Sequence, residues 1–542
     1  MAEKKTNIQL FHPMDLTQGA CWRTILLFSL PVILSYLLQQ VYSISDAAIV
    51  GQTLTAQEVA GVNDTASLVF IFLQFAFGVS AGFCVVTSCH VGAQNNAGVR
   101  RSLATQIVLS AALTAVLTAL ALVLLDPMLA WINVTPEDPE VYRAAYTYCF
   151  IIFVGIGAQL FYNFICSFLR SMGDSVTPLV FLLFSTLLNV GLDLLFILRF
   201  HWGVAGAAAA TVAAQLISTV ACFCYAFARY PDIRLKREDW HITLYDVRRH
   251  VSRGIPLGLQ FSVLAIGIIV MQSVVVQFDM LDGRMVSSAA QNGFGAANKL
   301  SSLVATPMNA LGTAMTSFTA QNLGAGRYDR IRKGTLQGMA VMGIMVLCAA
   351  GIGLLLTVND LYLHVFLSAD KVTEETVRFG NTFLYVDFAM YPFLGGIFLI
   401  RNCVQGIGRS TFVLGAGGAE LVAMCEGYAF AAKAGIDLQT TFEATRCGFV
   451  GGPMYENKVP KIIHRDYEPG ARIAVHRKDI LNAKHYAHKL GIDLPMTDVV
   501  LHVMDWMNDN GHIDDDQAAM VKYYEEKMGV TVGSAPDGAE TL

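Results

Sequence analysis

Charged residues are scarce in this sequence: Asp, Glu, Lys and Arg together make up 15% of it, whereas hydrophobic residues make up 54%. About a quarter of the residues in a typical soluble domain are charged. The shortage therefore excludes an ordinary soluble protein. Apolar segments of about 20 residues or more recur along most of the chain, and each is long enough to cross a bilayer as a helix.

Paired cysteines are also lacking. The 11 cysteines contain no CxxC spacing, which argues against a zinc site or a disulfide framework. Most of them lie singly in apolar runs, as Cys84 and Cys149 do, and are expected to be small buried hydrophobic residues. The N-terminal region has no short apolar core followed by a small-residue cleavage site, so no cleaved secretory signal is expected. Nothing points to a nucleic-acid partner.

Ten segments are predicted to cross the membrane as helices. They are residues 22–50, 60–92, 98–124, 141–169, 178–200, 203–229, 248–279, 285–322, 331–357 and 376–407. The fold class predicted from them is all-α, a polytopic membrane bundle.

Basic residues are concentrated in the loops on one side of these segments. They include Arg100 and Arg101, the basic link at 229–253 and the loop at 327–333, whereas the opposite loops contain TPEDPE and few basic residues. The positive-inside rule then places the N-terminus in the cytoplasm. We expect a multi-pass protein of the cytoplasmic membrane, in contact with lipid and monomeric.

The two halves of the apolar region resemble each other. FSLPVIL around Pro31 recurs as RGIPLGL around Pro256, VGAQNNAG as FTAQNLGAG, and ICSFLRSMGDS as IRNCVQGIGRS. The three matches keep the same order at separations of about 230 residues, which shared apolar composition does not explain. The sequence therefore predicts a parallel internal repeat of two helical lobes, with a central site between or within them.

Ionisable side chains at membrane depth are candidates for function, because each costs several kcal/mol unless it is paired or hydrated. Asn189 and Asp193 are four residues apart and share a helix face. Asp46 and Thr211 lie at a similar depth in two other predicted helices. Carboxylate, amide and hydroxyl oxygens suit Na⁺ or a proton. A purely structural helix-to-helix hydrogen bond is the alternative.

Two further polar residues interrupt apolar segments in the second half, Lys299 and Asp387. They are predicted either to neutralise each other as a structural pair or to contact a substrate. Pro31 and Pro256 are expected to kink their helices. The kinks would either only set the shape of each helix or let the helix bend during transport.

These residues together resemble a multidrug and toxic compound extrusion (MATE) transporter over about residues 15–423. The motifs are the first helix from Pro31 to Asp46, VGAQNNAG, FLRSMGDSVTP, NVGLD, GVAGAAAATVAAQ, TAQNLGAGRYDRIRKG and NCVQGIGRS. The resemblance implies two six-helix lobes, a central cavity, and export of organic cations or drugs in exchange for Na⁺ or H⁺. Asp46, Asn189, Asp193 and Thr211 match the family's cation site in the N-terminal lobe.

The sequence departs from that family in two places. Some members have a Glu in the seventh helix, where this chain has Leu264. The family also has twelve helices, but here the eleventh gives way to a segment with Glu420, Glu426 and Lys433. The C-terminal lobe is thus predicted to be truncated, which could impair transport, and residues 411–436 are expected not to span the membrane.

The composition changes to that of a soluble protein from about residue 424, with amphipathic helical spacing. EGYAFAAKAGID, RDYEPGARIAVHRKDI and GHIDDDQAA resemble the helical C-terminal domain of β-hydroxyacid (3-hydroxyisobutyrate-type) dehydrogenases. In that family the Lys matched by Lys478 lies near the cofactor, and Asp516 falls in the family's GH motif. The family's catalytic Lys is not found, and no dinucleotide-binding domain precedes the tail. VLGAGGAE has Glu420 at its third glycine position and lacks a βαβ context.

The sequence thus predicts a fusion of two incomplete reading frames. No enzymatic activity and no NAD(P) cofactor are expected, and Lys478 is expected to be a solvated charge. The tail is expected to be cytoplasmic and able to self-associate. The predicted parts are an N-lobe at 1–230, a truncated C-lobe at 231–423, the dehydrogenase-like domain at 424–532 and a disordered tail at 533–542. Two alternatives stay open. One is a lipid-linked oligosaccharide flippase, and the other is a membrane-anchored remnant of an NAD(P)-dependent dehydrogenase.

Overall fold

The computed structural model divides the chain into two compact units, residues 1–410 (unit 1) and 411–542 (unit 2). It describes residues 13–132, 134–281, 284–285, 287–367, 372–408, 425, 428–429, 432–433, 453–489 and 495–533. The predicted boundary at 423, the segment VLGAGGAE and most of residues 411–436 lie outside the described residues, so the predictions about them stay predictions.

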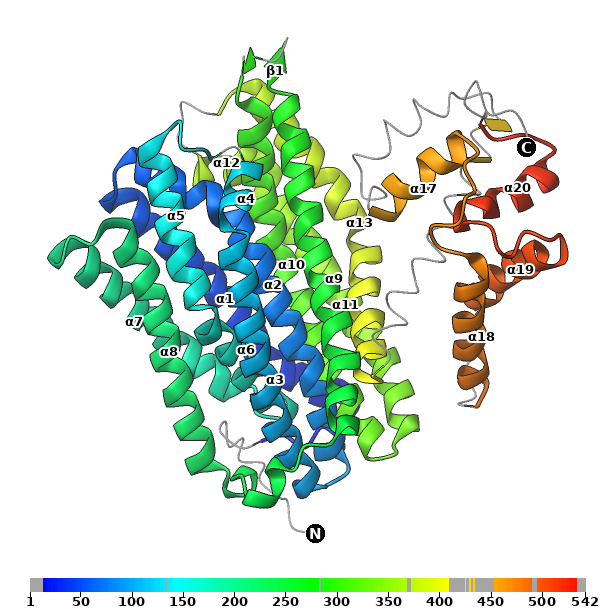
Figure 1. The fold of residues 1–542 in the computed structure, drawn as a ribbon, viewed down its shortest axis with the longest axis horizontal. Helices are drawn as coiled ribbons and strands as arrows, with labels where there is room; N and C mark the ends of the chain where they lie inside the picture. The colour runs from blue at the N-terminus through cyan, green and yellow to red at the C-terminus, as the bar shows by residue number, and fades with distance from the viewer. Residues whose placement is uncertain are drawn as a thin grey trace. The chain divides into compact units, whose positions relative to one another are not determined.

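Unit 1 is a bundle of long helices that run side by side (Figure 1). The first half consists of α1 (Cys21–Thr53), α2 (Ala56–Gly92), α3 (Asn96–Val123), α4 (Leu125–Trp131), α5 (Pro139–Val154), α6 (Ile156–Ser171), α7 (Val176–Asp193), the π-helical turn η1 (Leu194–Arg199) and α8 (Gly203–Arg229). The short turns η2 (Pro231–Ile233) and η3 (Arg237–Trp240) lead to the second half.

The second half consists of α9 (Leu244–Gln277), the hairpin β1 (Met280–Leu281) and β2 (Arg284–Met285), α10 (Ala289–Gly324), α11 (Tyr328–Thr357), η4 (Val358–Asp360), α12 (Leu361–Phe366) and α13 (Glu374–Gly406). The antiparallel hairpin pairs Met280 with Met285 and Leu281 with Arg284. We call α1–α8 the N-lobe and α9–α13 the C-lobe. The predicted all-α bundle is confirmed.

All ten predicted segments form helices. Seven of them are long and apolar enough to cross a membrane, and α5 with α6, bent by 46°, makes an eighth within the described residues. α9 and α10 are also long enough to cross a membrane, at 34 and 36 residues. α10 is rich in polar residues, and much of it is buried against other helices, where polar side chains face protein rather than lipid. The chain is thus a multi-pass membrane protein, and the count of ten crossings stays a prediction.

The first helix of each lobe packs largely on the other lobe. α9 lies mainly against α2, and α1 lies against α10 and α11 as well as α7. Cys21, Ile25 and Phe28 of α1 belong to the hydrophobic core of the C-lobe. Pro31 follows this part of α1 and removes one backbone hydrogen bond. It separates the part of α1 in the C-lobe core from the part that reaches the N-lobe.

The contact between α2 and α9 is made by two GxxxG patterns. A Cβ at Gly78 would lie 2.7 Å from the Leu257 carbonyl oxygen, and one at Gly82 would lie 2.5 Å from the Arg253 carbonyl oxygen. Cβ atoms at Gly254 and Gly258 would meet Phe83 and Val79 at 2.3 and 2.5 Å. Glycines therefore let the two helix backbones approach closely, as in other membrane helix pairs.

The two lobes also touch at the end of unit 1 where α1 begins and α2 ends, which we call the N-side; the opposite end is the far side. A Cβ at Gly92 would lie 1.8 Å from the Gln321 carbonyl oxygen, and one at Gly324 would lie 1.9 Å from that of Cys89. α2 ends at Gly92 and α10 at Gly324, so these two glycines are repeat-equivalent.

This register corrects part of the predicted repeat. Gln94 lies in a turn with φ 53°, whereas Gln321 is buried inside α10. The two Gln-Asn pairs are therefore not equivalent, because the match shifts by several residues across the turn. The third match holds, since Gly173 and Gly408 both end their helices with a left-handed backbone, φ 90° and 81°.

A segment before α1, residues 14–19, crosses both lobes on the N-side, and we call it the strap. The Met14 N–H donates to the Gly173 carbonyl of the N-lobe at 2.9 Å. The Arg330 guanidinium of the C-lobe donates to the carbonyls of Leu16 at 3.1 Å and Gln18 at 2.8 Å. Leu16 itself is fully buried in the C-lobe core. The strap thus fastens the lobes together on the N-side.

Arg330→Ala is expected to release the strap. The change removes several charge-assisted hydrogen bonds, each with a net value of about 1.5–3 kcal/mol. We expect the amide hydrogens of residues 14–19 to exchange at least ~10-fold faster, measured by hydrogen exchange and mass spectrometry. Arg332→Ala, at an exposed position two residues away, is the control. Unchanged exchange in Arg330→Ala would show that Leu16 burial and the other hydrogen bonds of the strap hold it without Arg330.

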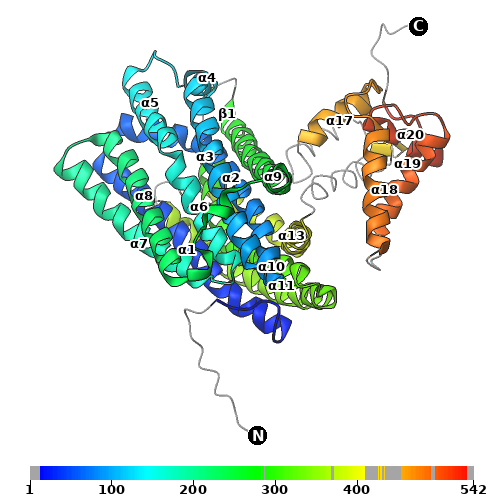
Figure 2. The same cartoon turned by 60° about the horizontal axis from the view of Figure 1, so that its bottom comes forward.

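Unit 2 is a separate helical domain with its own core. It contains α17 (Pro453–Ile463), α18 (Ile473–Lys489), α19 (Pro495–Asp509), η6 (Gln517–Met520) and α20 (Val521–Met528); Figure 2 shows these helices in a second view. Its core includes Cys425, Tyr455, Ile462, Met504 and Met520.

Candidate functional site

The four residues predicted to form an ion site come together in the N-lobe. Asn189 and Asp193 are buried on α7, and the Asn189 amide donates to the Thr211 hydroxyl of α8 at 3.4 Å. The carboxyl group of Asp46, on α1, lies within hydrogen-bonding reach of that of Asp193. Three helices therefore contribute to one cluster, which we call the carboxyl site.

The carboxyl site is rich in acceptors without donors. Apart from the contact between the two carboxyl groups, no described group donates a hydrogen bond to either Asp193 oxygen, to Oδ1 of Asp46 or to Oδ1 of Asn189. Two adjacent carboxylates in a medium of low dielectric constant repel each other by several kcal/mol. A proton or a small cation between them would remove the repulsion and satisfy the oxygens.

Two tyrosines complete the carboxyl site. Tyr42 and Tyr148 interact electrostatically with both Asp46 and Asp193. Sequence analysis missed them, although Tyr42 precedes Asp46 by four residues and so lies on the same helix face. The π-helical turn η1 begins directly after Asp193. π-Helical turns are rare and are frequent at functional sites.

The carboxyl site opens on a cavity of about 450 Å³, a size typical of small-molecule sites. Asp46 and Thr211 line it, whereas the buried Asn189 and Asp193 do not. Most lining residues come from the N-lobe, and the C-lobe supplies Phe261, Thr306 and Asn309. Half of the polar lining side chains are amides, namely Gln39, Gln40, Gln74, Gln159, Asn163, Gln215 and Asn309.

An aromatic pair joins the two lobes at the N-side edge of the cavity. The rings of Phe77 on α2 and Phe261 on α9 meet edge to face with centroids 5.3 Å apart. Both residues also line a second, much smaller cavity of about 50 Å³, which includes Arg170. The pair therefore separates the large cavity from the small one, and we call it the floor.

A family model described as MatE matches residues 31–195 and 265–423, which together are more than half of the chain. The chain belongs to the MATE family. The probable multidrug resistance protein YpnP of Bacillus subtilis (strain 168) is 31% identical over 403 residues, covering 74% of this chain and 86% of that relative. A structure titled as the outward-facing conformation of a multidrug resistance MATE family transporter has a TM-score of 0.67 at 19% identity, covering 77% of this chain and 89% of that one.

The tail of this MATE protein matches a second family. A model described as NAD-binding of NADP-dependent 3-hydroxyisobutyrate dehydrogenase covers residues 417–524. The 2-hydroxy-3-oxopropionate reductase of Escherichia coli (strain K12) is 32% identical over 103 residues, which are 19% of this chain and 35% of that protein. The predicted resemblance is confirmed. The expectation that the tail lacks a dinucleotide-binding domain is corrected in part, because the matched domain is itself described as NAD-binding.

The predicted contact between Lys299 and Asp387 is not formed. Asp387 accepts a hydrogen bond from the Ser301 hydroxyl at 2.5 Å, whereas the Lys299 ammonium lies over the Phe366 ring, 5.9 Å from its centroid. Ser301 and Lys299 are two positions apart on α10, so they point to different sides of the helix. The carboxyl group that Ser301 faces is thus out of reach of Lys299.

No described group of three or more His, Cys, Asp or Glu side chains could hold a metal ion. In unit 2, Lys478 is exposed on α18, and its predicted role as a solvated charge stays a prediction.

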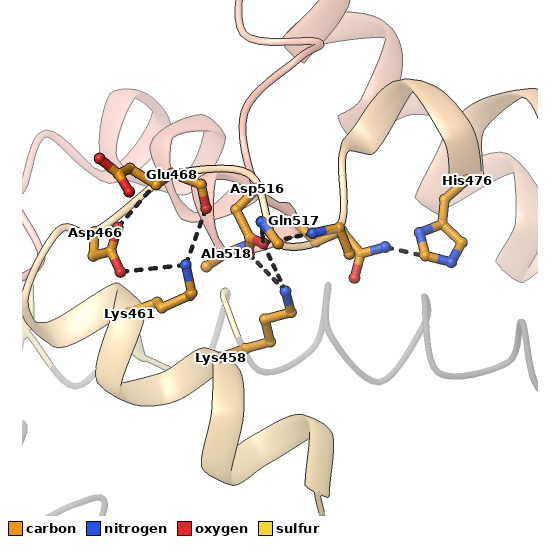
Figure 3. A network of polar contacts seen from close by, with 10 residues as sticks. Lys458, Lys461, Asp466, Glu468, His476, Asp516, Gln517 and Ala518 are labelled. Carbon is orange, nitrogen blue, oxygen red and sulfur yellow. Dashed lines mark hydrogen bonds and ion pairs between the residues drawn. The ribbon is translucent and has the colours of Figure 1, made fainter.

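Asp516 accepts more hydrogen bonds than any other carboxylate in the part of unit 2 that the structure describes. It is fully buried, and the Lys458 ammonium donates to both of its oxygens, at 2.7 and 2.8 Å. The N–H groups of Gly470, Ala471 and Ala518 donate to it at 3.0 Å each. Figure 3 shows Lys458 reaching toward Asp516, beside a second contact of Lys461 with Asp466. This carboxylate ties α17, the loop before α18 and η6 together.

Burial alone would raise the pKa of Asp516, but the Lys458 ammonium and the N–H groups of Ala518 and Ala471 outweigh it and hold the pKa below its ordinary value. A depressed pKa stabilises the folded state above the unfolded pKa, about 3.9 for Asp. That stabilisation is lost as the pH falls below this value.

Asp516→Asn is expected to destabilise unit 2 by ~3–5 kcal/mol, because it leaves the Lys458 charge buried without its partner. Hydrogen exchange of residues 455–532 in the full chain measures the effect. The exposed Asp514→Asn, two residues away, is the control. Equal protection in both variants would contradict a central role for this ion pair.

Proposed function

We propose that this chain is an antiporter that exports organic cations or drugs across the cytoplasmic membrane in exchange for H⁺ or Na⁺. The observation that supports this most is the carboxyl site at the edge of the cavity. Its two adjacent carboxyl groups require a proton or a cation, and Asp46 faces the space in which a substrate would lie.

The mechanism follows from competition between two ligands for one conformational equilibrium. An ion at Asp46 and Asp193 stabilises the arrangement of α1, α7 and α8 that the carboxyl site requires, and a substrate in the cavity favours the other arrangement. α1 connects the two events, since its first part lies in the C-lobe core and its last part bears Asp46, with Pro31 between them.

The N-side is assigned to the cytoplasm in this proposal. The α2–α3 turn, the link from α8 to α9 and the α10–α11 turn all lie on the N-side, and they contain the clusters of basic residues. In the conformation seen in the structure, the strap and the glycine contacts close the N-side. With the N-side in the cytoplasm, this conformation is closed toward the cytoplasm.

The test is ethidium efflux from cells that express the full chain, with a Na⁺ gradient or a pH gradient imposed in turn. Efflux that rises with one gradient supports the proposal and identifies the ion. Efflux that is independent of both gradients, with the protein present in the membrane, would contradict it.

For unit 2 we propose no catalytic role and no bound NAD(P). Because the matched family is described as NAD-binding, the test is a titration of the full chain with NADPH, followed by nicotinamide fluorescence. Saturable binding would overturn it and favour the dehydrogenase remnant as a second function.

A further inference from the structure

Two arginines lie between the floor of the cavity and the N-side, one in each lobe. Arg170 is in the last turn of α6, and Arg401 is near the end of α13. Sequence analysis missed both, although they lie in the repeated motifs ICSFLRSMGDS and IRNCVQGIGRS. Their helices occupy matching places in the two lobes, ending at the left-handed glycines Gly173 and Gly408.

Neither arginine has an anionic partner among the described residues. Nε of Arg170 and Nε of Arg401 are buried without a hydrogen bond. Their described contacts are with aromatic rings: Arg170 lies 6.0 Å from the centroid of Tyr36, and Arg401 lies 5.7 and 5.1 Å from those of Phe261 and Phe398. Both side chains are partly buried, and a guanidinium nitrogen shielded from water without a carboxylate is costly, so these positions favour an anion that comes from outside the protein.

The buried carboxylates that the structure describes at membrane depth are engaged elsewhere. Asp46 and Asp193 contact each other on the far-side half of the bundle, and Asp387 accepts from Ser301. Positive charge therefore accumulates on the N-side of the floor and negative charge on the far side of it. The transport pathway is polarised along its length.

The surroundings of the arginines are aromatic. Tyr36 lies between them, since it contacts Arg170 and interacts electrostatically with Arg401. Its hydroxyl forms a hydrogen bond with that of Thr313 at 3.0 Å. Tyr36, Phe77 and Phe261 also line the large cavity. Guanidinium groups bind carboxylate and phosphate by paired hydrogen bonds, and aromatic rings bind flat apolar bodies.

We propose that Arg170 and Arg401 bind the acidic group of an aromatic organic anion whose body extends past Phe77 and Phe261 into the large cavity. The inference rests on the proposed function, because it assigns a second substrate class to the same pathway. The small cavity of about 50 Å³ is lined by Arg170 together with Phe77 and Phe261 of the floor, so this guanidinium lies beside the boundary between the small cavity and the large one.

The experiment measures binding of fluorescein, an aromatic anion, to the purified full chain by fluorescence polarisation, with ethidium as the cationic comparison. Arg170→Gln and Arg401→Gln are each expected to raise the Kd for fluorescein at least ~10-fold and to leave the Kd for ethidium within threefold. Arg401→Lys, which keeps the charge, is expected to retain part of the affinity. Arg332→Gln, at an exposed position, is the matched control.

Ethidium binding and a single symmetric elution peak show that each variant is folded. Three results would overturn the inference: no fluorescein binding to the wild type, an unchanged Kd in the double Gln variant, or an equal loss of ethidium binding, which would indicate a structural role. Displacement of fluorescein by phosphatidylglycerol would assign the arginines to a lipid phosphate and would overturn a soluble ligand.

Failure of the anion-binding inference and failure of the proposed function can be told apart. Fluorescein binding needs no ion gradient and is expected to persist in Asp193→Asn. Gradient-driven ethidium efflux without arginine-dependent fluorescein binding would reject only the inference. Arginine-dependent binding without gradient-driven efflux would reject only coupled transport.

Discussion

Asp193→Asn is expected to lower ion-driven export by ~100-fold or more, equivalent to ~2.7 kcal/mol, with membrane insertion unchanged. Asp193 is fully buried, and among the described residues the Asp46 carboxyl group alone lies within hydrogen-bonding reach of its oxygens. An amide of the same shape can neither take up a proton nor neutralise a cation. The ion would then bind both conformations equally and could not shift the equilibrium between them.

The measurement is ethidium efflux at matched expression under the gradient that drives the wild type. Asp64→Asn is the control, since Asp64 is exposed on α2 at a depth similar to that of Asp46 and does not line the cavity. Export at the wild-type rate in Asp193→Asn would remove this residue from the mechanism. A comparable loss in Asp64→Asn would show that the assay responds to any lost carboxylate.

Gly82→Val is expected to abolish the close packing of α2 on α9 and to destabilise the transporter by more than ~3 kcal/mol. The new Cβ would lie 2.5 Å from the Arg253 carbonyl oxygen and 2.7 Å from the Gly254 Cα. Both are backbone atoms, so no side-chain rotation relieves the overlap. Since α2 and α9 hold the lobes together, the variant is expected to lose its monodisperse elution peak and its thermal transition.

Gly343→Val on α11 is the matched control. A Cβ at Gly343 would meet nothing within 4 Å, so this variant bears the same helix-propensity change without the overlap. Thermal unfolding in detergent, followed by size-exclusion chromatography, compares the two. Similar transition temperatures for Gly82→Val and Gly343→Val would contradict the inferred close contact.

Sequence patterns predicted the helices and the carboxyl site because each depends on local information. Apolar runs of membrane length define the helices, and the i, i+4 spacing of Asn189 and Asp193 defines a shared face. The meeting of these residues with Asp46 and Thr211 was predicted from their similar depth and from the family resemblance, and the structure brings all four together.

What the sequence did not predict depends on rotation and register between helices. The Lys299–Asp387 pair failed because Ser301, rather than Lys299, faces Asp387. The Gln-Asn match failed because the turn at Gln94 shifts the register of the repeat. The remaining features depend on contacts between residues far apart in the sequence. They are the packing of α1 and α9 on the opposite lobe, the strap, and the aromatic surroundings of Arg170 and Arg401, which have no anionic partner among the described residues.

The most direct test of coupled antiport at the carboxyl site is ion flux driven by substrate. The full chain is reconstituted in vesicles, an ethidium gradient is imposed without any ion gradient, and H⁺ and Na⁺ movements are recorded with lumenal indicators. The account predicts that ethidium movement drives one of the two ions in the opposite direction, and that Asp46→Asn and Asp193→Asn each abolish this ion movement. Ethidium transport without ion movement, or ion movement that persists in both variants, would contradict it.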